Sequence, residues 1–333
     1  AGTAQEDWIP LRPASFYTEN KIGLVTGTTV DRLDIPGRRV VLADGRRLPF
    51  DRLLLATGAE PVSLPVPGAD LPHVHLLRTL ADCRRLITAC GSARKVALIG
   101  SGFIGLEAAA ALRTRGLEVA IISPDATPLG RVLGAPVGAF LRSLHEEHGV
   151  VFHLGESVTA IEPSAVVTAS GKRVDADLVL VAIGVRPSVG LASAAGLTVD
   201  RGISVDAYLE TSASGVFAAG DVARFPDARS GRPIRVEHWA VAQNMGAIAA
   251  ENMLGARRPF TTVPFFWSVH YDVTLSYVGH VESPADASLD GRLEDRDCRV
   301  GYREDGAVRA VLTVGRDRES LEAERQLELA TPK

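Results

Sequence analysis

A duplicated pattern constrains the fold of this chain more than any other feature. The segments 23–61 and 149–187 each contain a strand that ends at a glycine, two short alternating strands around a second glycine, and an apolar run ending in Ala-x-Gly-x-x-Pro. The alternating strands indicate an antiparallel meander. The apolar run indicates a strand buried on both faces, as in a parallel sheet. The duplication therefore predicts two related α/β units.

The second copy follows a complete strand–loop–helix–strand unit. We expect a strand over 95–99, a helix over 103–115 that stops at Gly116, and a second strand over 117–122. Glycines in the intervening loop permit a tight turn and close approach of a pyrophosphate, and the helix N-terminus supplies unpaired N–H donors. The pattern predicts a bound dinucleotide, held by Gly100, Gly102, Phe103, Ile104 and Gly105.

The first copy has no such unit within the chain. Gly184 corresponds to Gly58 (184 − 58 = 126 positions), which puts the counterpart of Gly100 at position −26, before Ala1. In the doubly wound strand order the absent first strand would be central. Without it, strand edges and apolar surface would be exposed, so we expect residues 1–80 not to form a stable unit alone.

After the second copy, the chain is expected to return to the first unit. Strand patterns occupy 203–209 and 216–219, and a helix is expected over 239–254. The segment beyond residue 263 changes character and predicts strands at 265–267, 273–278, 298–302 and 308–314, then a helix over 320–329. We predict three domains, comprising residues 1–83 with 203–262, residues 84–202, and an α+β domain over 263–333.

The end of the strand over 117–122 bears on nicotinamide choice. An acidic residue there favours NAD, whereas a nearby arginine favours NADP. This chain has Ser123, which tolerates either, with Asp125 and Arg131 close by. Arg131 could contact the adenosine half or be a solvated surface residue. We favour NADH over NADPH.

Several residues at strand and helix ends could contact a cofactor. Ala56-Thr57-Gly58 and Ala182-Ile183-Gly184 end equivalent buried strands, and small residues there let the chain cross tightly over a ligand. Gly220-Asp221 follows another buried strand, where the acid could bond ribityl hydroxyls or cap a turn. Glu237-His238-Trp239 precedes a helix whose N-terminus could stabilise a reduced flavin.

Composition excludes several other functions. The net charge is −4, so no basic footprint indicates nucleic acid, and no apolar run is long enough to span a membrane. The three cysteines, Cys83, Cys90 and Cys298, form no Cys-x-x-Cys pair and no zinc spacing. We therefore expect no metal site and no redox-active dithiol. With no signal peptide, we expect a cytoplasmic protein, of an oligomeric state that the sequence does not set.

Seven segments together resemble the FAD-dependent ferredoxin reductases that serve cytochromes P450 and Rieske oxygenases. They are LRPASFY, DRLLLATGAEP, LIGSGFIGLEAAAALRTRGLEV, DLVLVAIGVRPS, VFAAGDVARF, EHWAVAQNMGAIAAENMLG and PFFWSVHYDVTLSYVG. The resemblance covers nearly the whole chain. It implies two Rossmann-like dinucleotide-binding domains of the FAD/NAD(P)-disulfide-reductase-like superfamily, the first incomplete, plus a small C-terminal α+β domain.

The resemblance also implies an activity. NADH would reduce FAD, and FAD would reduce a [2Fe–2S] ferredoxin one electron at a time. It implies that Thr57, Gly58 and Asp221 contact FAD with Val30 at its adenine, that Glu237, His238 and Trp239 flank its isoalloxazine with Trp267 near its edge, and that the loop Gly100 to Gly105 and Gly184 hold the nicotinamide dinucleotide. From the residues themselves we add Ala56 and Gly220 as FAD contacts, and Ser123, Arg131 and Ile183 as contacts of the nicotinamide dinucleotide, although Ser123 stands where NADH-preferring members usually have Glu.

The chain departs from this family at several points. The family's first GxGxxG and its Arg-Pro-Pro-Leu-Ser-Lys stretch are absent, so we expect FAD to bind weakly to this chain. Val269 and His270 replace an Asp and a Gln expected near the flavin and the partner. Two alternatives remain: a flavin-deficient module that binds only NAD(P), and a flavoreductase with another acceptor, such as rubredoxin or a quinone.

Overall fold

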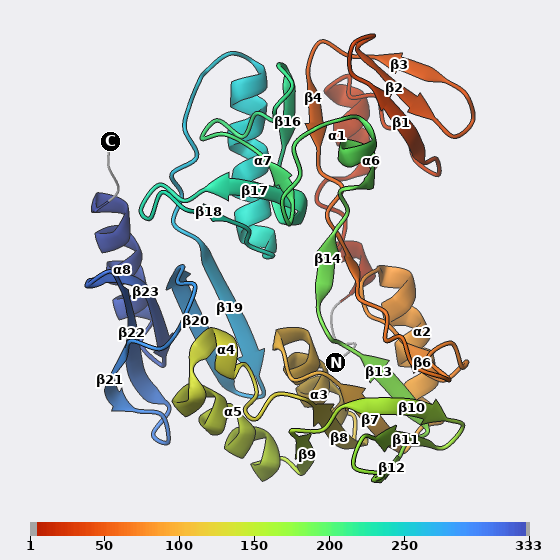
Figure 1. The fold of residues 1–333 in the computed structure, drawn as a ribbon, viewed down its shortest axis with the longest axis vertical. Helices are drawn as coiled ribbons and strands as arrows, with labels where there is room; N and C mark the ends of the chain where they lie inside the picture. Colours follow the sequence, from red (N-terminus) through yellow and green to blue (C-terminus); the bar gives the residue numbers. More distant parts are fainter. Residues whose placement is uncertain (1–4, 331–333) are drawn as a thin grey trace.

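The computed structural model describes residues 5–330, which form three groups of elements (Figure 1). One group is built on a parallel sheet in the order β6-β13-β7-β8-β9. Its strands are β6 (Val74–His75), β7 (Lys95–Ile99), β8 (Glu118–Ser123), β9 (Val150–Leu154) and β13 (Leu178–Val181). The first strand of the unit, β7, is central, as expected of a doubly wound sheet.

The two faces of this sheet are covered differently. Val96 and Leu98 of β7 point into a core shared with the helices α2 (Leu80–Cys90), α3 (Phe103–Thr114) and α5 (Ala135–Glu147). The alternate residues Ala97 and Ile99 face an antiparallel sheet of β10 (Val158–Glu162), β11 (Ala165–Thr168) and β12 (Arg173–Asp175). The predicted strand, glycine loop, helix and meander are thus confirmed. Gly116, with φ +84°, ends α3 as predicted.

The duplication is confirmed in the backbone. The first copy forms the same antiparallel meander from β1 (Val30–Asp34), β2 (Arg39–Leu42) and β3 (Arg47–Pro49). An irregularity in register follows Val30 in β1 and Val158 in β10, at equivalent positions. The strand β4 (Leu53–Leu55), the counterpart of β13, pairs in parallel with β16 (Val216–Ala218). Before β1, the described residues contain only η1 (Glu6–Trp8) and α1 (Ala14–Glu19).

The two copies also pair with each other. The strand β5 (Ala59–Pro61) lies antiparallel to its own counterpart, β14 (Val185–Pro187). Glu60 faces Arg186 at the centre of this ribbon, with Val185 opposite Pro61 and Pro187 opposite Ala59.

Several further elements lie between β7 and the C-terminal sheet. They are α4 (Gly130–Leu133), α6 (Gly190–Ala194), β15 (Ile203–Ser204), η2 (Gly220–Val222), β17 (Ala223–Pro226), β18 (Pro233–Ile234) and α7 (Trp239–Met253). The prediction of a strand over 203–209 is wrong beyond Ser204, where β15 ends. The Asp206 carboxylate accepts the backbone N–H groups of Tyr208 and Glu210, both at 2.9 Å, and so closes a turn there.

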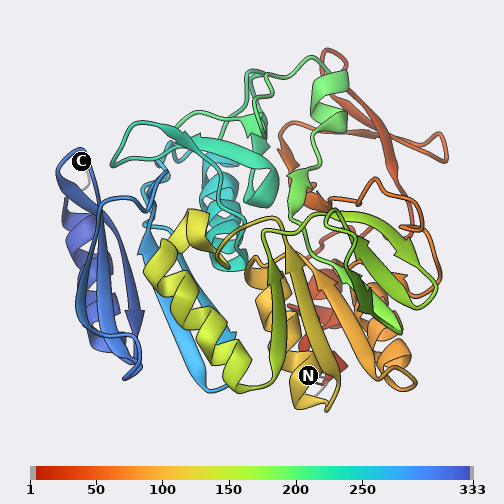
Figure 2. The same cartoon turned by 60° about the horizontal axis from the view of Figure 1, so that its bottom comes forward.

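The third group is a five-stranded antiparallel sheet in the order β19-β20-β23-β22-β21, packed against α8 (Asp317–Leu329). Its strands are β19 (Phe265–His270), β20 (Val273–Gly279), β21 (Ala287–Arg292), β22 (Asp297–Glu304) and β23 (Ala307–Val314). The sequence did not predict β21, because all six of its residues are exposed and none marks a buried face. Figure 2 shows α5 between this sheet and the parallel sheet, whose apolar residues share one core. None of the helices over 5–330 combines the length and the apolar character needed to cross a membrane.

Candidate active site

The glycine loop between β7 and α3 presents an open helix N-terminus. Gly100 has φ +110°, and a Cβ there would overlap the carbonyl oxygen of Ala182. Gly105 touches the backbone of Gly100 so closely that it also leaves no room for a side chain. At Gly102, by contrast, a Cβ would meet nothing within 4 Å. The first turn of α3 holds no acidic residue and no side-chain cap. Its N–H donors therefore suit a pyrophosphate.

The candidate nicotinamide-selecting residues lie beyond this loop. Ser123 is 1% exposed, and its hydroxyl accepts a hydrogen bond from Ser101 at 2.9 Å. Asp125 pairs with the exposed Arg131 at 2.6 Å. The guanidinium of Arg131 is thus already engaged by a carboxylate rather than free for a phosphate.

A second groove, with a volume of about 520 Å³, lies where the ends of β4 and β16 meet α7. Small residues from the ends of β4 and β16 and from α7 line it: Ala56, Gly58, Ala219, Gly220, Ala242 and Gly246. Asp221 and Arg78 form an ion pair across it at 3.1 Å. The small lining residues leave room for a flat ligand, and the ion pair could bond its hydroxyl or phosphate groups. The groove therefore fits a flavin dinucleotide.

Some predicted cofactor residues also have structural partners. The Thr57 hydroxyl donates to the carbonyl oxygen of Ser188 at 2.8 Å, which ties the two copies together. Val30 is half-buried and packs on the core beside β4. Ile183 packs against the core of the parallel sheet. Gly184, with φ +107°, makes the turn into β14.

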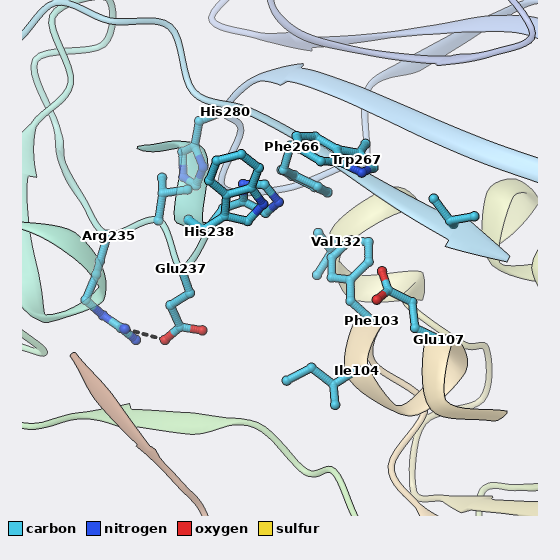
Figure 3. Close-up of a pocket in the computed structure, with 13 residues that line it drawn as sticks. Phe103, Ile104, Glu107, Val132, Arg235, Glu237, His238, Phe266, Trp267 and His280 are labelled. Carbon is cyan, nitrogen blue, oxygen red and sulfur yellow. Dashed lines mark hydrogen bonds and ion pairs between the residues drawn. The ribbon is translucent and has the colours of Figure 1, made fainter. Parts of the chain in front are cut away.

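A central pocket of about 600 Å³ joins the two cofactor regions (Figure 3). It is lined by Phe103, Ile104 and Glu107 from α3, by Glu237, His238 and Trp239 at the start of α7, and by Phe266, Trp267 and Val269 from β19. The same three residues at the start of α7 also line the flavin-sized groove. The pocket therefore lies where ligands in the two regions would meet.

Aromatic rings define one wall of this pocket. His238 and Trp239 each lie 5.4 Å from Trp267 between ring centroids, and Phe103 contacts Phe266 edge-on at 5.1 Å. Burial lowers the pKa of His238, although the Asp221 carboxylate acts in the opposite direction. The ring is therefore neutral at neutral pH. Its Nδ1 accepts the backbone N–H of Ala240 at 3.3 Å and caps α7.

Sequence reasoning missed several pocket and groove residues, namely Arg78, Glu107, Arg235, Phe266 and His280. Glu107 had a detectable signal, because it places a carboxylate within the otherwise apolar residues 103–112 of the helix. Desolvation raises its pKa, outweighing a hydrogen bond of 2.6 Å from the Ser268 hydroxyl. Arg235 pairs with Glu237 and donates to the Asp221 carbonyl oxygen at 3.1 Å. No signal in the sequence indicated that pairing.

Comparisons with known proteins agree with this geometry. Residues 5–246 match the family described as pyridine nucleotide-disulphide oxidoreductase. The ferredoxin–NAD(+) reductase component of an anthranilate 1,2-dioxygenase system from Burkholderia cepacia is 42% identical over 273 residues, which are 81% of this chain and 67% of that protein. Putidaredoxin reductase from Pseudomonas putida is 36% identical over 326 residues, covering 95% of this chain and 77% of that protein.

Solved structures extend the likeness to the fold. A chain in the crystal structure of the covalent putidaredoxin reductase–putidaredoxin complex has a TM-score of 0.94 at 34% identity, covering 99% of this chain and 81% of that chain. Against rhodocoxin reductase from Rhodococcus erythropolis, at 36% identity, the chain spans 65% of the relative's length. Because the family match covers residues 5–246, well over half of the chain, the chain belongs to the pyridine nucleotide-disulphide oxidoreductase family.

Proposed function

We propose that this protein carries electrons from NADH through FAD to a [2Fe–2S] ferredoxin that serves a P450 or Rieske oxygenase. The observation that carries the proposal is the shared wall at the start of α7, where the flavin-sized groove and the central pocket meet. The names of the relatives, which include reductase components of dioxygenase systems, support the choice of acceptor.

Each region has a proposed occupant. FAD lies in the groove between β4, β16 and α7, in the domain assigned to 1–83 and 203–262. The nicotinamide dinucleotide lies on the loop at Gly100–Gly105, in the domain assigned to 84–202. The ion pair between Asp125 and Arg131 favours NADH. The 2′-phosphate of NADPH would have to compete with the Asp125 carboxylate for the Arg131 guanidinium.

The residues have distinct roles in this assignment. The N-terminus of the 15-residue helix α7 offers its positive dipole end to the ligand in the groove. Trp239 and Trp267, which are 60% and 36% exposed, offer their rings to a flat ligand in the pocket. Glu107 places a carboxyl group beside the pocket, and desolvation raises its pKa. A bound flavin would supply the capacity to accept a hydride and release single electrons.

The three cysteines are unpaired. Thiols persist in reducing compartments, which supports our placing the protein in the cytoplasm.

The test begins with the visible spectrum of the purified protein after gel filtration with added FAD. Because this chain lacks the family's first GxGxxG, we expect only part of the added flavin to co-elute. The absorbance of the retained flavin should bleach with NADH and return when oxidised ferredoxin is added. Asp221→Asn should weaken flavin retention because it breaks the ion pair with Arg78, whereas Asp200→Asn, on the surface, should not. Nicotinamide binding without flavin would favour a binding module, and reduction of a quinone or rubredoxin but not ferredoxin would change the acceptor.

A further inference from the structure

A chain of hydrogen bonds leads from the central pocket through the protein interior. The Ser268 hydroxyl lies 2.6 Å from the Glu107 carboxylate and 3.0 Å from Nε2 of His270. Nδ1 of His270 lies 3.2 Å from Nε2 of His145, and Nδ1 of His145 lies 3.3 Å from the Tyr271 hydroxyl. Ser268, His270 and His145 are 1%, 0% and 0% exposed. The two cofactor regions use none of these three.

The donors in this chain can all point the same way. Ser268 donates to Glu107, so its oxygen is free to accept from Nε2–H of His270. Nδ1 of His270 then accepts from Nε2–H of His145, whose Nδ1 accepts from Tyr271. Every hydroxyl and ring uses one donor and one acceptor. The chain is therefore continuous from Tyr271 to Glu107.

Both imidazoles are neutral. Desolvation lowers the pKa of His145 to about 3, with His270 and His148 adding to the shift, and lowers that of His270 to about 4. A neutral imidazole donates from one nitrogen and accepts at the other, so it passes a proton by exchanging tautomers. A cationic ring would donate from both nitrogens and interrupt the chain.

Tyr271 anchors the outer end. It lies in the hairpin between β19 and β20 with φ +58°, a backbone region that costs a bulky residue about 1–3 kcal/mol. Its ring stacks on His148 with centroids 3.5 Å apart, and it is only partly buried. The strained turn thus holds the hydroxyl against His145 while the residue keeps contact with solvent.

Glu107 forms the inner end. Its side chain opens into the central pocket and is partly exposed to solvent there. A dinucleotide seated against Phe103 and Trp239 would cover that opening. Other charged or titratable groups face the two ends of the chain: Arg113 and His148 near Tyr271, and Arg235, Glu237, His238 and His280 around the pocket.

We propose that these five side chains form a proton relay, which keeps Glu107 in exchange with bulk water while a bound dinucleotide covers the pocket. The proposal rests on the proposed function. Oxidation of one NADH by two one-electron ferredoxins gives NAD⁺, two reduced ferredoxins and one proton, so a proton must leave a covered site in each cycle.

The relay has two states that differ by one proton. In the first, Glu107 is a carboxylate and every donor points toward it. In the second, Glu107 is protonated and donates to Ser268, each ring carries its proton on Nδ1, and Tyr271 donates to water. Passing from the second state to the first breaks the O–H bond of Glu107 and releases one proton from Tyr271 to solvent. No electron moves in this step.

The first test follows ring tautomers by ¹⁵N NMR of the histidine-labelled protein without cofactors. As the pH falls through the pKa of Glu107, we expect His145 and His270 to change together from Nε2–H to Nδ1–H without gaining charge. Ser268→Ala should abolish this joint change while Glu107 still titrates. Rings that become cationic in this range, or a joint change that survives in Ser268→Ala, would overturn the relay.

The second test measures proton release with a pH-indicator dye in single turnovers of the flavin-loaded protein with NADH and ferredoxin. Ser268→Ala should slow release roughly a hundredfold relative to hydride transfer, at the low end for positioned acid–base groups. Tyr271→Phe should act in the same direction, because it removes only the outer hydroxyl.

His153→Gln is the matched control, since this histidine lies on β9, outside the chain, and bonds Lys172 at 2.9 Å. Its proton release should equal that of the unmodified protein. Equal release in Ser268→Ala and the unmodified protein would refute the relay alone. Absence of hydride transfer in the unmodified protein would instead refute the proposed function and leave the tautomer measurement to judge the relay.

Discussion

Two buried histidines make the folded chain sensitive to acid. Burial lowers the pKa of His145 and His270 to about 3 and about 4 from 6.5. The unfolded chain therefore binds protons between about pH 4 and 6.5 that the folded chain does not, so the free energy of unfolding falls as the pH drops through this window. Glu107 acts with the opposite sign. Its raised pKa gives a contribution that is lost as the pH rises above 4.5.

We predict that His270→Gln flattens this acid dependence, because a glutamine cannot be protonated. Urea unfolding between pH 4 and 6.5 should show a loss of about 1 kcal/mol or more in the unmodified protein and a smaller loss in the variant. His153→Gln should keep most of the original slope. An unchanged slope in His270→Gln would show that His270 is not the group responsible.

The Asp125–Arg131 pair allows a test of nicotinamide choice. Asp125→Asn removes the carboxylate that pairs with Arg131, and so frees the Arg131 guanidinium for a 2′-phosphate. We predict a several-fold lower KM for NADPH with little change in that for NADH, measured by steady-state flavin reduction. The double variant with Arg131→Ala should lose the gain. A gain that persists without Arg131 would assign it to another cation.

At the scale of elements, the loop between β7 and α3 contains one glycine that the fold does not require and one that it does. Gly102 has φ −81°, and a Cβ there would meet open space, so alanine fits the fold. Under the proposed function, that same Cβ would stand where the pyrophosphate approaches the loop. At Gly105, a Cβ would overlap the Gly100 carbonyl oxygen.

We therefore predict opposite outcomes for two alanine substitutions. Gly102→Ala should leave the free energy of unfolding within about 0.5 kcal/mol and weaken NAD⁺ binding, as measured by titration calorimetry. Gly105→Ala should lower the free energy of unfolding by about 1–3 kcal/mol, because the helix must move away from the strand. Equal NAD⁺ affinity in Gly102→Ala and the unmodified protein would place the pyrophosphate elsewhere.

How far the sequence predicts each element depends on where its stabilising contacts come from. The core of α3 and β7 was predictable, because the local periodicity indicates which residues are buried and Gly100 marks the tight turn between the strand and the helix. The strand β21 was not, since it exists only through pairing with β22. The ion pair of Arg78 with Asp221 joins residues 143 positions apart, and the relay joins three separate elements. Such contacts follow from the assembled fold rather than from any local pattern.

For the whole molecule, the shared core unites the parallel sheet with the C-terminal antiparallel sheet. Leu98 and Leu141 belong to the same apolar cluster as Tyr277 and Leu312. The hydroxyl of Tyr302, at 0% exposure, donates to the carbonyl oxygen of Leu133 at 2.9 Å and crosses between the two groups. The two groups should therefore unfold as one unit.

Native-state hydrogen exchange tests this. Amides of β7, β8, β22 and β23 should exchange through openings of equal free energy. Tyr302→Phe leaves the Leu133 carbonyl without its donor, so it should lower that free energy by about 1–3 kcal/mol in all four strands. Faster exchange confined to β22 and β23 would mean that the C-terminal sheet opens independently.

The ribbon of β5 and β14 has the geometry of a two-fold contact inside one chain. Ala59 faces Pro187, the counterpart of Pro61, and Pro61 faces Val185, the counterpart of Ala59, as in an isologous dimer. In a dimer of identical subunits, the central residue would face itself, so any charge there would repel its own copy. Here Glu60 faces Arg186, with a charge separation of 3.7 Å. Because the two copies are joined in one chain and can differ in sequence, opposite charges can meet at the centre of the ribbon. A symmetric dimer of identical subunits could not place an attractive pair at that position.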